Sequence, residues 1–247
     1  MNQELSPQQA AENIITYLKQ LAEPHFAHQS QRFFKTPVVL LGIRAGQLRQ
    51  VAKEFYTQIK NSWTLNQVLE FSEYLFGSPY VEIRTLAIFV LGYYSKWLKK
   101  HHLKLIKTWL EKNYCDNWAL IDYFCPQILS PLLLKNPELS REILTWTESV
   151  NKWVRRAAVV SFIQPVRQSL FLSEAYQVAE KLFEDKEDLI QKAIGWLLRE
   201  VGKKNMARLE KFLLLHGPRI PRTTLRYAIE RFPEDKRRII LKETRLK

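Results

Sequence analysis

The sequence predicts an all-α protein built as an α-solenoid of helical hairpins, on three observations. Apolar residues recur at helical spacing throughout the chain, and no stretch alternates strictly between apolar and polar residues. Only 7 of the 247 residues are glycine, which disfavours a sheet-rich fold with many tight turns. Similar segments also return with a period of about 35 residues, which is typical of stacked helical pairs.

The first expected helix runs from Pro7 to about Leu21. Ser6 is suited to the N-cap and Pro7 to the first helical position, while Pro24 ends the helix. Four basic residues follow in a segment that also contains aromatic side chains: His25, His28, Arg32 and Lys35. This segment is either an ordinary solvated face or a contact for a phosphate backbone.

Paired helices are expected over the rest of the chain. An apolar connector at 37–43 leads into a helix at 44–59. The first helices of the following pairs are expected at 65–76, 102–112, 137–146 and 173–184. The second helices contain the similar segments 81–90, 153–160 and 189–196, together with the breaker-free run 117–124.

Superposing these segments aligns one position from each repeat. The aligned positions are Arg49, Thr85, Asp122, Arg156, Lys192 and Arg226. In a solenoid they form one stripe along one surface, with four cations and one acid. We therefore expect a single domain over 1–247 that is curved and has a basic concave face, a surface suited to a duplex backbone.

The acid of this stripe lies in the segment between Cys115 and Cys125. In a helix, Trp118 and Asp122 share one face because they are four residues apart, and Trp196 lies four residues after Lys192 on the corresponding face. Two tryptophans would thus flank one carboxylate on a basic surface. The alternative is that Trp118 is a core residue and Asp122 a solvated or capping acid.

Charge and composition limit the class of partner. The 38 Lys and Arg residues against 25 Asp and Glu residues leave a net charge of +13, which favours a polyanion, and nucleic acid above all. No apolar run approaches the ~20 residues that span a bilayer, and the start lacks the apolar core of a signal peptide, so a cytoplasmic protein is expected. Two cysteines cannot form a tetrahedral zinc site, so no metal is expected.

Several of these segments together resemble the AlkD-like DNA glycosylases, which have HEAT-like helical repeats and remove alkylated purines from DNA. The resemblance covers nearly the whole chain. It includes the pair Trp118 and Asp122 and the segments 41–43, 153–158, 191–200 and 222–229, of which 191–200 is the most specific. The sequence departs from that family at Ala119, where family members often have an acidic residue directly after the tryptophan.

The resemblance implies a role for each of these residues. Asp122 is implied to be the catalytic acid, Trp118 and Trp196 to pack around the lesion-bearing deoxyribose, and Arg156 to hold the backbone. It also implies that the damaged base stays largely in the stack, whereas most glycosylases flip it out.

The expected activity is that of a monofunctional glycosylase, acting as a monomer without a cofactor on alkylated double-stranded DNA. No lysine is placed as a Schiff-base nucleophile, and no cysteine cluster or glycine-rich loop suggests an iron–sulfur cluster or a nucleotide. The cations expected to contact DNA are Arg49, Arg155, Arg156, Lys192 and Arg226. Two alternatives stay open: a non-catalytic protein that binds branched or distorted DNA, and a protein-interaction scaffold.

Overall fold

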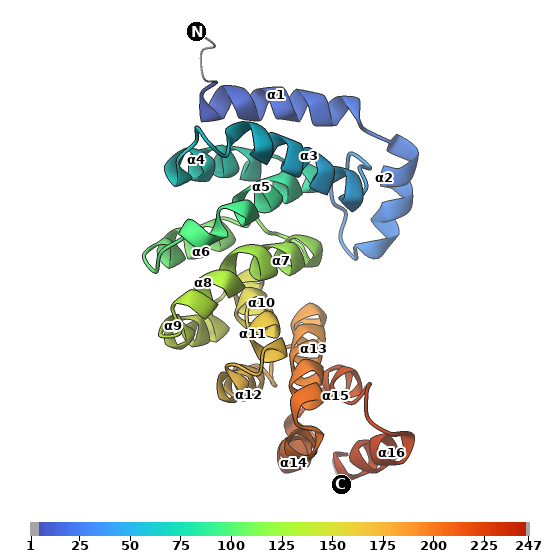
Figure 1. Ribbon diagram of the computed structural model, residues 1–247. Coiled ribbons are helices and arrows are strands. Elements are labelled where there is room, and N and C mark those ends of the chain that lie inside the picture. The colour runs from blue at the N-terminus through green and yellow to red at the C-terminus, as the bar shows by residue number, and fades with distance from the viewer. Residues whose placement is uncertain (1–4, 246–247) are drawn as a thin grey trace. The chain divides into compact units, whose positions relative to one another are not determined.

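The computed structural model describes residues 5–245, and helices dominate it (Figure 1). Within that range, β-structure is limited to one isolated bridge between Val39 and Tyr80. The predicted all-α fold is therefore confirmed. The chain divides into two compact units, the first ending at Leu132 and the second beginning at Leu133. The single domain over 1–247 stays a prediction.

The helices of the first unit follow the expected order with one addition. They are α1 (Pro7–Gln20), α2 (Pro24–Ser30), α3 (Ala45–Ile59), α4 (Leu65–Phe76), α5 (Val81–Tyr93), α6 (His102–Glu111) and α7 (Trp118–Phe124). Short 3₁₀ turns follow α2 (Gln31–Phe33) and α5 (Ser95–Trp97), and a π-helical turn (Cys125–Leu129) leads from α7 into α8 (Ser130–Lys135). The addition is α2, which lies where the sequence predicts only a basic segment with aromatic side chains.

Two of these helices begin at reciprocal side-chain caps. Ser6 accepts a hydrogen bond from the backbone N–H of Gln9 (3.2 Å), and the Gln9 side chain accepts one from the backbone N–H of Ser6. Thr64 and Gln67 form the same capping box before α4. Each box satisfies N–H groups that a helix start leaves without partners. The predicted cap at Ser6 is therefore confirmed.

Helix α5 is the central helix of the first unit. Every side chain from Val81 to Leu91 is buried, and α5 packs against α3, α4 and α7. The buried set includes a charged residue, Glu82, on its first turn. Because α5 is enclosed on all sides, its sequence is a nearly continuous apolar run without an amphipathic pattern.

The Glu82 carboxylate holds the apolar connector that precedes α3. It accepts hydrogen bonds from the backbone N–H groups of Leu41 (3.0 Å), Gly42 (2.8 Å) and Ile43 (3.4 Å). Gly42 adopts φ +84°, and a Cβ there would lie 2.2 Å from the carbonyl oxygen of Glu23. A buried charge is tolerated here because three donors surround it.

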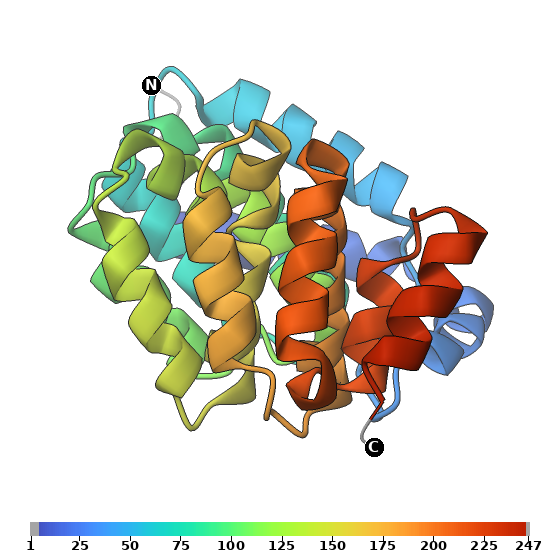
Figure 2. The same cartoon turned by 90° about the horizontal axis from the view of Figure 1, so that it is seen from below.

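The second unit continues the helical hairpins. Its helices are α9 (Leu139–Thr145), α10 (Lys152–Val160), α11 (Ile163–Arg167), α12 (Leu172–Lys181), α13 (Asp188–Lys204), α14 (Met206–His216), α15 (Arg222–Ala228) and α16 (Glu234–Glu243). Helices α9, α12, α14 and α16 lie side by side in Figure 2, and the Tyr176 and Phe212 rings, 4.5 Å apart, join α12 to α14. Helix α13 packs against α10, α12 and α15.

Polar contacts between successive repeats join residues that are 30 to 33 positions apart. Arg84 donates to the carbonyl of Tyr114 and Arg155 to the carboxylate of Asp185, each across 30 residues. The same step separates other pairs in the second unit: Lys181 and Glu148, Arg167 and Glu200, Thr224 and Gln191, and Arg199 and Glu230, at 31 to 33 residues. The repeat inferred from the sequence is thus visible as a recurring set of hydrogen bonds.

The sequence predicts a protein that has neither a membrane-spanning helix nor a signal peptide. Within residues 5–245, no helix combines the length and apolar character needed to cross a bilayer. The expected absence of a signal peptide concerns the start of the chain, of which residues 1–4 lie outside the described residues.

Candidate functional site

Helix α7 presents the tryptophan and the acid on which the candidate site depends. Asn117 is its N-cap and accepts a hydrogen bond from the backbone N–H of Leu120 (3.1 Å). The helix therefore begins at Trp118, and Asp122 follows one turn later on the same face. Both side chains are half-buried, while Leu120 and Ile121 are buried in the core. The predicted helical spacing of Trp118 and Asp122 is thus confirmed, but their chemical roles stay a prediction.

The indole of Trp118 is held by the segment that follows α2. Its Nε1–H donates to the backbone carbonyl of Phe33 (3.3 Å), and its ring stacks on that of Phe34 with centroids 5.7 Å apart. An aromatic stack with one hydrogen bond fixes both the position and the tilt of the indole. Phe33 itself is 60% exposed, so the segment also presents an unburied aromatic ring beside this contact.

Sequence reasoning missed this partnership. The contact joins residues 85 positions apart, and neither a helical nor a repeat period predicts it. The available signal was the adjacent pair Phe33 and Phe34 in a basic segment, since aromatic rings among cations are common on nucleic-acid surfaces.

Arg49 lies beside the acid's neighbour on α7. Its guanidinium is over the ring of Phe89 (5.2 Å to the centroid) and over that of Tyr123 (5.6 Å), the residue after Asp122. The Phe89 and Tyr123 rings meet edge to face at 5.1 Å. Because Arg49 remains exposed, its charge is available to an anion while its stem is held against these rings.

The remaining predicted residues belong to the second unit. Arg156 on α10 is buried, at 5% exposure, and its guanidinium donates to the carbonyl of Leu189 at the start of α13. Lys192 on α13 is half-buried and forms an ion pair with Asp188 (3.0 Å). Trp196 follows Lys192 by one helical turn and is half-buried, whereas Arg226 on α15 is exposed. The helical spacing of Lys192 and Trp196 is thus confirmed.

Arg155 is committed to internal contacts. Its Nε donates to Asp185 (2.7 Å), whose side chain is largely buried, and its Nη1 donates to the carbonyls of Ser149 (2.8 Å) and Val150 (3.0 Å). These bonds tie α10 to the start of the next repeat. A DNA contact by Arg155 stays a prediction, and it would have to use donors beyond these three.

The predicted residues fall into two sets, one in each unit. Trp118, Asp122 and Arg49 belong to the first unit, with Trp118 and Asp122 on one face of α7. The second unit contains Arg155, Arg156, Lys192, Trp196 and Arg226. The joint use of the two sets in one site is a hypothesis.

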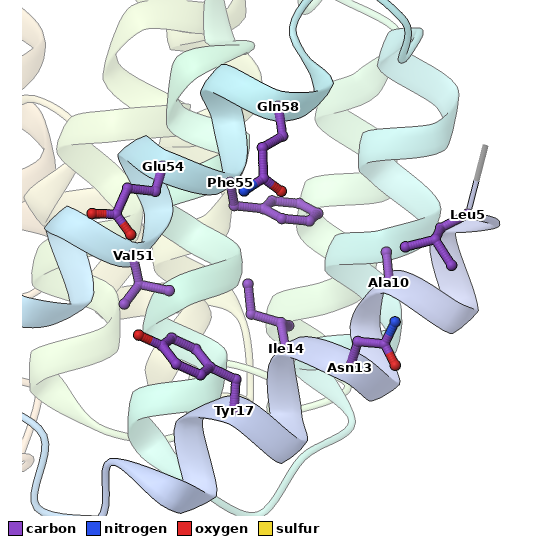
Figure 3. Close-up of a pocket in the computed structure, with 9 residues that line it drawn as sticks. All are labelled: Leu5, Ala10, Asn13, Ile14, Tyr17, Val51, Glu54, Phe55 and Gln58. Atoms are coloured by element: carbon purple, nitrogen blue, oxygen red, sulfur yellow. The ribbon is translucent and has the colours of Figure 1, made fainter. Parts of the chain in front are cut away.

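One hollow of the first unit differs in chemistry from a phosphate site. A cavity of about 380 Å³ lies between α1 and α3, and Figure 3 shows Ile14 and Tyr17 of α1 facing Val51 and Phe55 of α3 across it. Glu54 is the charged residue in its lining, so this cavity does not suit an anion. Within residues 5–245, no group of three or more His, Cys, Asp or Glu side chains could hold a metal ion.

The chain is similar to known proteins in sequence and in fold. The sequence profile of the DNA alkylation repair enzyme family matches residues 14–232. No curated protein matches the sequence significantly.

Three solved structures share the fold. One, described as a predicted DNA alkylation repair enzyme from Enterococcus faecalis, has a TM-score of 0.76 at 17% identity and covers 86% of this chain and 97% of its own. AlkD2 from Streptococcus mutans has a TM-score of 0.59 at 20% identity, covering 85% and 99%. The protein smu.31 from Streptococcus mutans UA159 has a TM-score of 0.58 at 21% identity, covering 88% and 100%.

Proposed function

Because this chain belongs to the DNA alkylation repair enzyme family, we propose that it is a DNA glycosylase that removes N3- or N7-alkylated purines from duplex DNA by hydrolysis. The observation that carries the proposal is the pair on α7, in which Asp122 shares a helix face with an indole fixed by Phe33 and Phe34. On a surface that only binds phosphate, a carboxylate would weaken binding because it repels the phosphates. Its presence therefore points to chemistry at a developing positive charge.

The reaction needs little from general acid catalysis. An N3- or N7-alkylated purine carries a positive charge, so when the C1′–N bond breaks, the electron pair moves onto the base and neutralises it. The sugar becomes oxocarbenium-like, and water adds to C1′ with loss of a proton. The Asp122 carboxylate would stabilise the positive sugar and orient or deprotonate this water. No cofactor, metal or amine nucleophile is required, so the proposed enzyme is a monofunctional hydrolase of base excision repair.

Indole faces would assist the carboxylate. An aromatic face attracts a cation by about 0.5 to 2 kcal/mol, and the sugar becomes cationic only in the transition state. We assign this role to Trp118, whose ring the protein already holds, and to Trp196 in the second unit. Interactions that strengthen in the transition state raise the rate of the chemical step.

Cationic side chains would supply the affinity for DNA. Arg49 and Arg226 are exposed and are proposed to contact phosphates directly. Lys192 would exchange Asp188 for a phosphate, while the buried Arg156 and the half-buried Arg155 would act with the donors left after their internal bonds. We propose that these residues line a basic concave face of a curved solenoid, and that the protein acts as a cytoplasmic monomer.

A second candidate function is binding of branched or distorted DNA without base removal. It is favoured by the engagement of the Trp118 indole, whose N–H and one ring face are already used by the protein. Under this alternative, Trp118 anchors α7 to the segment after α2. Asp122 then has no chemical role.

Base release from methylated duplex DNA tests the proposal, with Asp122→Asn as the informative variant. The substitution keeps the side chain's shape and removes its charge. Loss of one such transition-state interaction, about 3 to 4 kcal/mol, slows excision by roughly 10² to 10³. Asp235→Asn on the exposed first turn of α16 removes the same charge as a matched control and should leave the rate unchanged.

Binding to undamaged duplex is measured in parallel. It should hold or improve for Asp122→Asn, because a negative charge leaves a surface that faces phosphates. Equal excision by the parent and by Asp122→Asn would show that Asp122 is not catalytic. A parent protein that binds DNA tightly and releases no base would establish the second candidate function.

A further inference from the structure

A basic cavity lies at the C-terminal end of α3, the helix that carries Arg49, and of α5, the central helix of the first unit. It has a volume of about 550 Å³ and is formed where α3 and α5 end and where α4 and α6 begin. Its lining includes Lys60 after α3, Thr64 before α4, Tyr94 after α5, and Lys99 and His101 before α6.

This cavity is separate from the candidate site on α7. Arg49 does not line it, and the Arg49 guanidinium lies over the Phe89 and Tyr123 rings, which do not line it either. An anion in the cavity and an anion at Arg49 are therefore different groups.

The chain segments that form the cavity supply lysines and no acidic side chains. The segment 83–110, which supplies most of α5, the following turn and most of α6, contains five lysines and no Asp or Glu. The segment 55–69, which supplies Lys60 and the start of α4, also contains no acid. Lys60, Lys99 and His101 are exposed, and Lys96 and Lys100 lie next to them in the sequence. Cations concentrated without acids favour an anionic ligand and disfavour a metal ion.

An aromatic ring is exposed within this group of cations. Trp97 lines the cavity and is 43% exposed, and its ring lies 5.2 Å from that of Tyr94. The ammonium of Lys96 lies 4.2 Å from the Trp97 centroid. An indole that is supported by another ring and remains open to solvent is suited to stacking on a base.

The cavity wall also contains a polar group that lacks a partner. The hydroxyl of Tyr94 is buried, with the residue at 3% exposure, and no described residue forms a hydrogen bond with it. Buried hydroxyls are normally hydrogen-bonded. Tyr94 therefore offers a donor and an acceptor at the wall of a cavity whose lining also includes Lys60, Lys99 and the Trp97 ring.

We propose that this cavity binds a nucleotide of a DNA strand, with the base stacked on Trp97 and the phosphate held by Lys60, Lys99 and His101. The shared chemistry is a planar base joined to a phosphate, so a free nucleotide is the other source of the same ligand. An acidic peptide would satisfy the cations but would leave the exposed indole without a partner. The site does not depend on base removal at Asp122, and the proposal stands whether or not the protein is a glycosylase.

The indole N–H resonance of Trp97 in a nitrogen-15 NMR spectrum of the full chain reports on the site directly. Trp97→Phe assigns it, since one of the seven tryptophan signals disappears. The probes are a pentamer of thymidine nucleotides, thymidine monophosphate and hexaglutamate. The pentamer should shift the Trp97 signal to saturation, and Trp97→Ala should weaken pentamer binding about fivefold or more, as expected for loss of one base stack.

The double variant Lys60→Gln, Lys99→Gln tests the phosphate contacts. Each phosphate contact of a single strand contributes about −0.7 to the slope of log affinity against log salt, so the slope should become shallower by up to about 1.4. The control Lys53→Gln, Lys204→Gln removes the same charge from exposed positions outside the cavity lining and should leave the Trp97 titration unchanged.

The remaining outcomes identify the ligand. Tighter binding of the pentamer than of thymidine monophosphate assigns a strand, and equal binding assigns a free nucleotide. A Trp97 signal that none of the probes shifts overturns the proposal. So does a signal that hexaglutamate shifts as strongly as the pentamer, or a titration that both double variants leave unchanged.

Discussion

Replacement of Glu82 by glutamine should destabilise the first unit more than any surface substitution. The carboxylate is 6% exposed and accepts three backbone N–H groups, from Leu41 to Oε2 and from Gly42 and Ile43 to Oε1. Glutamine keeps one carbonyl oxygen and places an amide NH₂ where the other oxygen stood. At least one backbone donor then faces another donor inside the protein.

The structure sets the magnitude. A hydrogen bond to a charged group contributes about 1.5 to 3 kcal/mol, and a buried donor left unsatisfied costs about 1 to 3 kcal/mol. The long contact to Ile43 (3.4 Å) is the weakest of the three, so we expect a loss of about 2 to 4 kcal/mol for Glu82→Gln. At about 2 to 4 °C per kcal/mol for a chain of this size, the unfolding midpoint should fall by about 5 to 15 °C. Glu82→Ala, which removes both acceptors, should cost more.

Thermal unfolding followed by circular dichroism at 222 nm measures the effect. Glu70→Gln on the exposed face of α4 removes the same charge without removing a buried acceptor, and its midpoint should match that of the parent. If Glu82→Gln and Glu70→Gln unfold at the same temperature, the three hydrogen bonds do not stabilise the connector and the reasoning fails.

Three further predictions concern charge and aromatic contact. Burial raises the pKa of the Glu200 carboxyl, but hydrogen bonds from Lys203 and Arg167 outweigh it and lower that pKa below its ordinary value. The resulting stability is present above the unfolded pKa of about 4.3 and is lost as the pH falls through the lower folded value, so urea titrations should show Glu200→Gln destabilising the protein at pH 7 and much less at low pH. Arg226→Gln should make the salt dependence of duplex binding shallower by about 0.9, and an unchanged slope would exclude a phosphate contact. Phe34→Ala removes a stack of about 0.5 to 1.5 kcal/mol on the Trp118 indole and should slow excision without changing the salt slope; an unaffected rate would show that the stack does not position the indole.

The sequence predicted the helices because the interactions that begin a helix lie within about one turn of the chain. The expected helix at 65–76 matches α4, since Thr64 and Gln67 form a capping box within one turn of sequence. Helix α2 was missed because Pro24 was interpreted only as a stop, although proline also fits the first position of a helix. Helix α1 ends at Gln20, and Pro24 is the first residue of α2.

The sequence did not predict the contacts between segments that are far apart in the chain. The stack of Phe34 on Trp118 and the enclosure of the 41–43 connector by Glu82 join residues that no periodic pattern relates. They are also linked to each other, because the backbone N–H of Glu23 at the start of α2 donates to the carbonyl of Leu41 (2.9 Å). The buried Glu82 carboxylate therefore holds the 41–43 connector. Through the hydrogen bond between Glu23 and Leu41, it also helps to position the segment after α2 that contacts Trp118.

The arginines that recur along the chain differ in their surroundings, and this difference bears on the predicted DNA contacts. Arg84, Arg155 and Arg156 were indistinguishable in sequence from phosphate contacts, yet each donates to a residue of the next repeat, 30 to 33 positions later. Arginines that recur with the repeat period of a solenoid can therefore have either of two roles. Some join neighbouring hairpins, and others bind a ligand that lies along the solenoid. Exposure separates the two, and it selects Arg49 and Arg226 as the cations whose replacement should cost DNA affinity before it costs stability.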